Sequence, residues 1–517
     1  MSEWKKWLRA ATVLAPVTLA SSAFAQEVPP STAPTGVTTI DPPPPVLAPP
    51  PAIQLPPPAP PPPPPPPAPP PPAAPPVTAP LWNPIYTGSY FTRYELRKGY
   101  DDLGLSTGRA RFSEGDAVFY RVRFGLNTGM FDLGQGIKVG LQITPQAAGT
   151  FGNNGPNTIV DAQLGLHEGY ARVAGKYVRV DAGRYELNYG DAFIIGNLDW
   201  NEIARTFDGV RTRISSSPTS AWLDVFANVV DEGRPDFLGV ADGDYYFLGA
   251  YAALGPAIRP NFDLDLYVLA RAWGDAKGVQ AATGAAANPM TTYRRENAAE
   301  ATLGARSKAK FGIFDYRVEV GLQAGSRPGA APTLTNGVLS ANQVDAVDVL
   351  AYQGDLELGV SFAQDKLRLG LEGLYASGDN PRSRGKNTGW DELFPTAHKW
   401  LGLSDAFVQG TIKRTNVASG VLHLTANPIK PVVLQVDGHL FARPEPTAVG
   451  GKEGLAGGEV DVGVVYTLAK GLKVRALYAL FMPDSNLYAD RIPARMVPGN
   501  PDPVHYFETE LRYDLIP

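Results

Sequence analysis

The sequence contains no cysteine, and its five histidines occur singly along the chain. The missing cysteine excludes both a disulfide framework and a lipoprotein anchor. Neither a G-x-S-x-G nor an H-E-x-x-H motif is present, and the scattered histidines have no metal-ligand spacing. We therefore expect no catalytic residue, no cofactor and no metal site.

Long apolar runs are also missing once the first 25 residues are passed. A helix that spans a bilayer needs about 18 or more consecutive apolar residues, so no transmembrane helix is expected there. The formal net charge is −5, and this slightly negative balance indicates no nucleic-acid partner. Neither absence excludes a membrane protein built from strands.

The N-terminal region predicts export. Three cationic residues, an apolar run over 10–20 and the small-x-small sequence Ala23-Phe24-Ala25 are typical of a cleaved signal peptide covering residues 1–25. Residues 26–80 then form a proline-rich segment, which contains more than half of the 51 prolines. Proline fixes φ and lacks an N–H, so this segment favours extended polyproline II over a packed fold. We expect a disordered periplasmic linker or arm, serving either as a spacer or as a docking site for a periplasmic secretion or scaffold protein.

Apolar and polar residues alternate along most of the remaining chain, which we treat as one domain over residues 81–517. In the stretch AVFYRVRFGLN, for example, Val122 and Phe124 alternate with Arg121 and Arg123. The same period of two recurs in GIKVGLQIT, DYRVEVGLQ, DLELGVSF, GEVDVGVVYTL and HYFETELRYDL. A period of two is typical of strands, whereas helices repeat every three or four residues.

These segments predict an all-β fold, a transmembrane antiparallel β-barrel of about 18 strands with outward apolar and inward polar residues. Short connections such as MFDLGQG alternate with longer ones over 278–295 and 379–404, as in outer-membrane barrels. A soluble β-sandwich also alternates. However, no linker divides residues 85–517, and the polar positions carry interleaved charges of both signs, which suits a water-filled lumen.

Two long motifs carry a family resemblance. The stretch GRYELNYGDAFIIGNLDWNEIARTFDGVR (183–211) and the stretch ASGDNPRSRGKNTGWDELFPTAHKWLGLSD (376–405) resemble the signature segments of the alginate-export family of outer-membrane proteins. The resemblance implies an 18-stranded monomeric barrel in the outer membrane of a Gram-negative bacterium. It also implies passive passage of an anionic exopolysaccharide, alginate in the founding members, as the partner. The founding exporters lack the proline-rich arm.

A polyanionic sugar chain needs guanidinium and ammonium groups that face water, and arginine matches a carboxylate with a planar fork. The alternation predicts which charged residues face the lumen, with acids interleaved so that a chain can move from site to site. The predicted pore-lining residues are Arg93, Arg121, Arg123, Lys138, Arg211, Arg213, Asp263, Asp265, Arg271, Arg306, Arg317, Glu319, Arg368, Arg475 and Arg512. Opposed arginines and acids also brace porin walls of any specificity, so wall bracing is the competing interpretation.

The motif residues have their own interpretation. Their polar groups can satisfy the backbone of long connections that fold over or into the pore and narrow or gate it, with Trp200 and Phe207 as anchors. The residues concerned are Asn188, Asp191, Asp199, Trp200, Asn201, Arg205, Asp208, Asp379, Pro395, His398 and Asp405. Paired carboxylates among Asp191, Asp199 and Asp208, or Tyr189 with His167, would be the basis of an alternative enzymatic function on sugars.

Two pore functions thus remain open from the sequence, beside a purely structural envelope anchor that would act through the proline-rich arm and would not need a charged lumen. The first is an outer-membrane pore for anionic exopolysaccharide, and the second is a general or anion/sugar-selective uptake porin. The expected partners are the polysaccharide and the lipid of the outer membrane.

Overall fold

The computed structural model describes most of the C-terminal part of the chain. The described residues are 84–100, 114–152, 163–215, 221–231, 244–274, 276–280, 291–329, 334–335, 338–339, 343–380, 385–406, 414–446, 453–484 and 502–515. The expected signal peptide and proline-rich arm lie outside these residues. The described residues all belong to the larger of the chain's two units.

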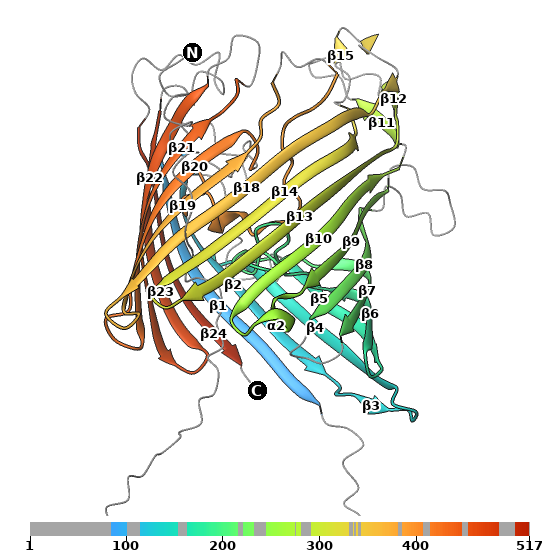
Figure 1. The fold of residues 1–517 in the computed structure, drawn as a ribbon, viewed down its shortest axis with the longest axis horizontal. Coiled ribbons are helices and arrows are strands. Elements are labelled where there is room, and N and C mark those ends of the chain that lie inside the picture. Colours follow the sequence, from blue (N-terminus) through green and yellow to red (C-terminus); the bar gives the residue numbers. More distant parts are fainter. Residues whose placement is uncertain are drawn as a thin grey trace, which may run out of the picture. The chain divides into compact units, whose positions relative to one another are not determined.

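The larger unit is a closed antiparallel barrel (Figure 1). Eighteen strands follow one another around it, and β1 pairs with both β2 and β24, so a single chain closes the sheet. The strands are β1 (Ile85–Lys98), β2 (Gly115–Asn127), β4 (Lys138–Thr150), β5 (Gln163–Ala174), β6 (Val178–Tyr185), β7 (Phe207–Ser215), β8 (Trp222–Asp231), β9 (Tyr245–Ala253), β10 (Phe262–Trp273), β13 (Ala298–Phe311), β14 (Phe314–Arg327), β18 (Val347–Phe362), β19 (Leu367–Ala376), β20 (Val417–Ala426), β21 (Val432–Arg443), β22 (Gly454–Ala469), β23 (Leu472–Pro483) and β24 (Val504–Leu515).

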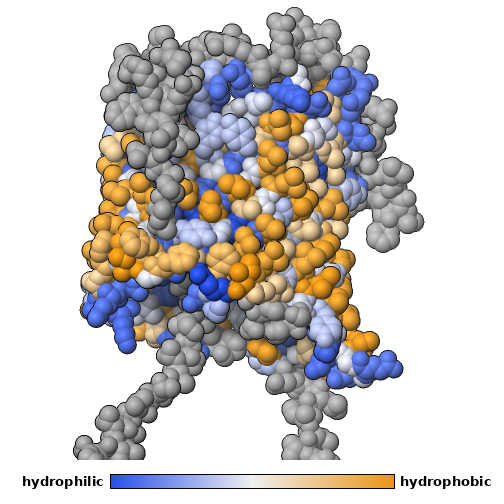
Figure 2. Space-filling model, viewed as in Figure 1, coloured by the Kyte–Doolittle hydropathy of each residue, from blue (hydrophilic) through white to orange (hydrophobic). Residues whose placement is uncertain are grey.

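The alternation of the sequence becomes the inside and outside of the barrel. On β2, Val122 and Phe124 point outward and are 45% and 52% exposed. Arg121, the neighbour of Val122, points inward and is fully buried. Hydrophobic residues cover much of the outer face of the strands in Figure 2, and hydrophilic residues gather toward the two ends. Closure removes every sheet edge, which is the condition for placing strands in lipid. The predicted fold class is confirmed.

The connections differ in length at the two ends. The end that holds the start of β1 and the end of β24 has short connections, including Gly312–Ile313 and Lys470–Gly471. There β3 (Phe131–Asp132) pairs with β4, and α2 (Gly255–Ile258) precedes β10. The opposite end carries the long connections and two small sheets, formed by β11 (Ala276–Gln280), β12 (Thr291–Arg295) and β17 (Gln343–Val344), and by β15 (Leu334–Thr335) and β16 (Val338–Leu339).

No helix among the described ranges is long and apolar enough to cross a membrane.

Candidate functional site

Two connections from the long-loop end fold back into the barrel. We call residues 186–206, between β6 and β7, the crossing loop, and residues 377–416, between β19 and β20, the partner loop; the partner loop includes the short helix η2 (Ala397–Lys399). The two loops pair through a parallel bridge between Ile195 and Phe394. The amide of Gly196 donates to the carbonyl of Phe394 at 2.7 Å. The two family-like motifs, far apart in sequence, therefore form one unit.

Aromatic packing explains why these loops lie inside. The crossing loop contributes Phe193, which is fully buried, and the partner loop contributes Trp390 and Trp400, at 1% and 3% exposure. They belong to one core cluster with apolar residues of the wall, including Phe247 on β9. Burying large aromatic rings is strongly favourable, so apolar contact holds the loops against a wall that is otherwise polar.

One end of the crossing loop is held by arginines of β1, β2 and β24. The Asp199 carboxylate accepts from Arg123 at 2.6 Å, pairs with Arg121 at 3.0 Å and also pairs with Arg512. Arg121 additionally donates to the carbonyls of Asp199 and Asn201. Three guanidinium groups on one carboxylate make this a strong electrostatic anchor.

Trp200 adds a second set of contacts at the same end. Its carbonyl accepts from Arg93 Nη1 at 2.6 Å, and its indole nitrogen donates to Glu508 at 3.2 Å. Its ring stacks on the imidazole of His398, with 3.7 Å between centroids. His398 in turn lies 2.9 Å from Asp405. Trp200 therefore joins the wall to both loops, as its predicted anchoring role requires.

The other end of the crossing loop is held by β13. Asp191 pairs with Arg306 at 2.5 Å and with Lys308 at 3.0 Å, and its carbonyl accepts from Lys399 of the partner loop at 3.2 Å. Strand pairing places β13 nine strands from β1 in both directions around the barrel. The crossing loop thus spans the lumen from one wall to the opposite wall.

Charge compensation sets the protonation of these anchors. Burial alone would raise the pKa of Asp191 and of Asp199, but the neighbouring cations hold both pKa values well below their usual range. For Asp191 the main cation is Arg306, and for Asp199 it is Arg512. Burial lowers the pKa of Lys399 to about 8, against the attraction of Asp191. Both carboxylates are consequently ionised at neutral pH.

The partner loop has its own contacts with the wall. Asp391 pairs with Arg271 of β10 at 2.9 Å, and its carbonyl accepts from Gln323 of β14 at 2.7 Å. Farther along, the hydroxyl of Ser404 donates to Glu459 of β22. Asp379 stays within the loop, where it accepts from the amide of Thr388 at 3.0 Å.

Every arginine in the predicted pore-lining set is paired with a carboxylate. Six of those fifteen residues fall on β10, β13 and β14, and the others are spread over β1, β2, β4, β7, β19, β23 and β24. The pairs not yet given are Arg93–Glu95, Arg211–Asp181, Arg213–Asp224, Arg271–Glu300, Arg306–Asp263, Arg306–Asp265, Arg317–Asp355, Arg368–Asp315 and Arg475–Glu508. Glu319 accepts from the hydroxyl of Tyr267, and Lys138 is exposed at the short-turn end. Many of these arginines therefore brace the wall or the loops.

One section of wall brings four partly exposed guanidinium groups together. We call it the basic wall: Arg172 on β5, Arg179 on β6, and Arg211 and Arg213 on β7. Their side chains are 13–30% exposed, whereas their partners Asp181 and Asp224 are 1% and 0% exposed. Four partly exposed guanidinium groups thus lie over two buried carboxylates.

The wall across the barrel has the opposite character. Strand β20 lies nine strands from β6, and on β18–β22 buried carboxylates predominate. We call these the acidic wall, consisting of Asp355, Glu357, Glu372, Asp437, Glu459 and Asp461. Among the described residues, arginines thus predominate on one side of the lumen and buried carboxyl groups on the other.

Some motif residues lie elsewhere than expected. Asp208 was predicted to support the connection, but it is an outward-facing residue of β7 and pairs with Arg184 of β6 at 2.6 Å. The strand begins at Phe207, so the period of two places Asp208 outside. Asn188 is exposed. Arg205 does support backbone, donating to the carbonyls of Gly196 and Pro395 at 3.1 and 3.0 Å.

Glu186, the first residue of the crossing loop, is a functional residue that the sequence did not predict. Glu186 accepts from His167 at 2.7 Å and from Asn197 at 2.9 Å, and its carbonyl accepts from Arg211. Glu186 directly follows Tyr185, the last residue of β6. Its place in the loop could be predicted only if the end of that strand were known.

A closed barrel with an apolar outer face and a charged, loop-crossed lumen defines an outer-membrane pore of a Gram-negative bacterium. The alginate export family model matches residues 162–460, more than half of the chain. The chain belongs to the alginate export family. The resemblance seen in the two motifs is thereby confirmed.

Solved structures support the fold. Pseudomonas aeruginosa OpdL is 13% identical, with a TM-score of 0.52 over 84% of this chain and 99% of its own. Acinetobacter baumannii OccAB1 is 10% identical, with a TM-score of 0.54 over 84% and 96%. The outer membrane protein opdK of P. aeruginosa is 13% identical, with a TM-score of 0.51 over 83% and 99%. A comparison with curated protein sequences gives no significant match.

Proposed function

We propose that this pore passes an anionic exopolysaccharide out of the periplasm by passive conduction. The observation that carries the proposal is the basic wall, where guanidinium groups are exposed and their carboxylate partners are buried. Arginine binds sugar carboxylates through paired hydrogen bonds. Membership of the alginate export family supports the same substrate class.

The position of the basic wall suits a chain arriving from the periplasm. Arg172 and Arg179 flank the short turn between β5 and β6, and Arg213 lies near the end of β7 at the same side. Outer-membrane barrels place their short turns in the periplasm. A polyanion would therefore meet this wall before the crossing loop.

A favourable wall alone would hold a polymer too tightly to release it. Each of these arginines already shares its charge with a buried aspartate, which limits attraction to any one sugar unit. The acidic wall opposite disfavours contact of the polymer with that side. A chain would thus be guided along β5–β7 through several weak sites, as conduction requires.

The test is block of ionic current by uronic acid oligomers in planar bilayers, with the oligomers added at the short-turn side. We expect concentration-dependent block that neutral glucose oligomers of equal length do not produce. Arg179→Gln should raise the half-blocking concentration, because Arg179 is 30% exposed and is held only loosely, 3.4 Å from Asp181. Its removal leaves Arg172 and Arg211 on that carboxylate.

The matched control is Arg184→Gln. Arg184 is an arginine of the same strand, but it points outward and pairs with Asp208. Block should remain as in the wild type. Equal block by neutral and acidic oligomers, or equal sensitivity of both variants, would refute the proposal.

An uptake porin is the second candidate, and the crossing loop favours it. A loop fixed to opposite walls leaves less room for a polymer than for a small solute. Current that uronic acid oligomers do not block, together with permeation of small sugars or anions in liposome swelling, would support this candidate instead.

A further inference from the structure

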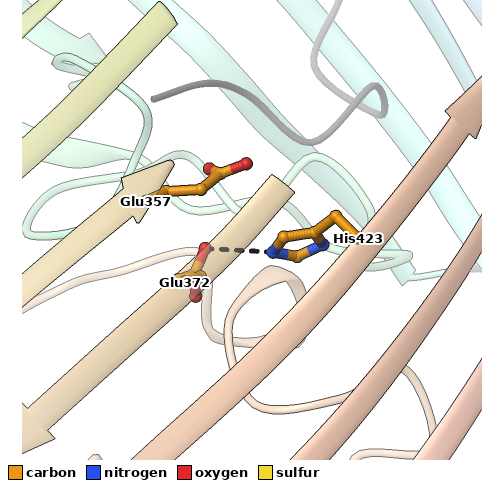
Figure 3. A group of neighbouring side chains, drawn as sticks. All are labelled: Glu357, Glu372 and His423. Carbon is orange, nitrogen blue, oxygen red and sulfur yellow. Dashed lines mark ion pairs between the residues drawn. The ribbon is translucent and has the colours of Figure 1, made fainter. Parts of the chain in front are cut away.

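We propose that Glu357, Glu372 and His423 form a binding site for a divalent metal ion of the Zn²⁺ class on the acidic wall. Each residue offers one ligand atom, and the three atoms lie within 4.8 Å of one another. The side chains come from β18, β19 and β20 and converge on one space (Figure 3). All three residues are buried, at 1%, 6% and 7% exposure.

The orientation of His423 is the observation that distinguishes this group from a simple acidic cluster. Its Nδ1 lies 2.7 Å from the Asp437 carboxylate, on the directly opposite residue of β21. Its Nε2 is turned toward Glu372 at 3.5 Å, too far for a hydrogen bond of ordinary strength. Among the described residues, this buried nitrogen has no hydrogen-bond partner.

This arrangement is the one that metal-binding histidines use. A ligating imidazole usually binds a carboxylate through its second nitrogen, which fixes the ring and leaves the other nitrogen unprotonated for the metal. Here Asp437 fixes the ring, and His423 Nε2 faces the two glutamates. Because its one contact, with Glu372, is long, this buried nitrogen is poorly satisfied, and a ligand at this position would satisfy it.

The local charge also favours a cation. Glu357 and Glu372 are directly opposite each other on neighbouring strands, an arrangement that is unfavourable for like charges. In this network of ion pairs, two guanidinium groups face five carboxylates. The carboxylates are Asp315, Asp355, Glu357, Glu372 and Asp437, and the guanidinium groups are Arg317 and Arg368.

In the structure, Arg317 bridges the two glutamates, at 3.1 Å from Glu357 and 2.8 Å from Glu372. A metal ion would compete with it for these oxygens. Arg317 would still keep Asp355, which lies 2.7 Å from its other terminal nitrogen. Binding therefore exchanges one cation for another without leaving a buried guanidinium unpaired.

The ligand types select the metal class. One imidazole and two carboxylates form a mixed nitrogen and oxygen set, which suits Zn²⁺ and related divalent ions, whereas Ca²⁺ and Mg²⁺ prefer oxygen alone. Three protein ligands would leave a fourth position for water. Sequence spacing does not predict this site, because only the pairing of three strands brings its ligands together.

The test measures Zn²⁺ binding to the full chain in detergent after removal of metals with a chelator. We expect one Zn²⁺ per barrel that excess Mg²⁺ or Ca²⁺ does not displace, and a visible absorption band when Co²⁺ replaces Zn²⁺. Both measurements use the unaltered protein. No stoichiometric binding would overturn the proposal and would leave His423 as an ion-pair bridge between Asp437 and Glu372.

Variants then assign the ligands. His423→Gln should abolish stoichiometric binding, and Asp437→Asn should weaken it by about 10- to 100-fold, as loss of a group that orients a ligand does. His167→Gln is the matched control, since His167 is also buried and also contacts one carboxylate, Glu186, at 2.7 Å. Binding that persists in His423→Gln, or that is lost equally in His167→Gln, would contradict the assignment. Heat-modifiable migration in gels verifies that each variant is folded.

Discussion

Substitution of Asp199 by asparagine should release one end of the crossing loop. Asparagine has nearly the same shape as aspartate but no charge. The negative charge of Asp199 is paired with three arginines, Arg121, Arg123 and Arg512. The substitution keeps the volume and one acceptor oxygen. It removes the charge and leaves the three guanidinium groups to repel one another.

The magnitude follows from the burial of the pair. Removing one partner of a buried ion pair costs about 3–5 kcal/mol. Asp199 is 23% exposed, and the Asn side chain can still accept one hydrogen bond, so we expect a loss of about 2 kcal/mol in the docking of the loop. At about 1.4 kcal/mol per factor of ten, the undocked population rises roughly 30-fold.

Single-channel recording in planar bilayers measures this change. The variant should show more frequent transitions to states of higher conductance, because an undocked loop no longer spans the lumen between β1 and β13. Acidification provides a second observable. Since the pKa of Asp199 is depressed in the folded barrel, its contribution to docking is present above its ordinary pKa and is lost as the pH falls toward the folded value. The wild type should therefore begin to resemble the variant below about pH 4, while the variant itself should respond less.

Asp208→Asn is the control. Asp208 is an aspartate of the same motif that pairs with one arginine, but it faces outward and its side chain is 53% exposed. An exposed pair contributes little, so its conductance should match the wild type. If Asp199→Asn shows wild-type conductance and noise, the crossing loop is not held by this anchor and the reasoning is refuted.

The remaining predictions concern Lys399 and Gly183. Anion selectivity, measured as the reversal potential in a salt gradient, should fall as the pH rises through about 8, because Lys399 loses its charge there. Lys399→Met should flatten this pH dependence. A wild-type selectivity that does not change with pH would contradict the prediction. Gly183→Ala should destabilise the barrel by about 1–3 kcal/mol in urea unfolding, because Gly183 has φ +129° and an added Cβ would lie 2.3 Å from the carbonyl oxygen of Gly169. Gly373→Ala has open space around the added atom and should change stability little; equal effects of the two substitutions would count against the steric explanation.

Much of the barrel could be predicted because its solvent environment is periodic. Lipid outside and polar groups inside impose a period of two on every strand. The faces of Val122 and Arg121 can therefore be predicted without knowing which strands pair with theirs. The first strand begins at Ile85 and the last ends at Leu515, as the alternation indicates. The same rule also explains Asp208, which faces outward once β7 is known to begin at Phe207.

Pairing between distant residues could not be predicted in this way. Asp191 and Asp199 lie in one short segment, yet one binds β13 and the other binds β1, β2 and β24. Their partners depend on where the loop lies in the closed barrel. A charged residue in a sequence shows that a partner is needed, but it does not show which one.

The sequence by itself determined the class of the fold, the inward set of charged residues and the family, because these rest on local periodicity and on two contiguous motifs. Only the tertiary structure decided that the motif loops meet inside the lumen, that every predicted pore-lining arginine already has a carboxylate partner, and that four partly exposed arginines lie together on β5–β7. The physical reason is that closure of the barrel sets the distances between strands. Coulomb interactions and hydrogen bonds act over those distances and not over separations along the chain.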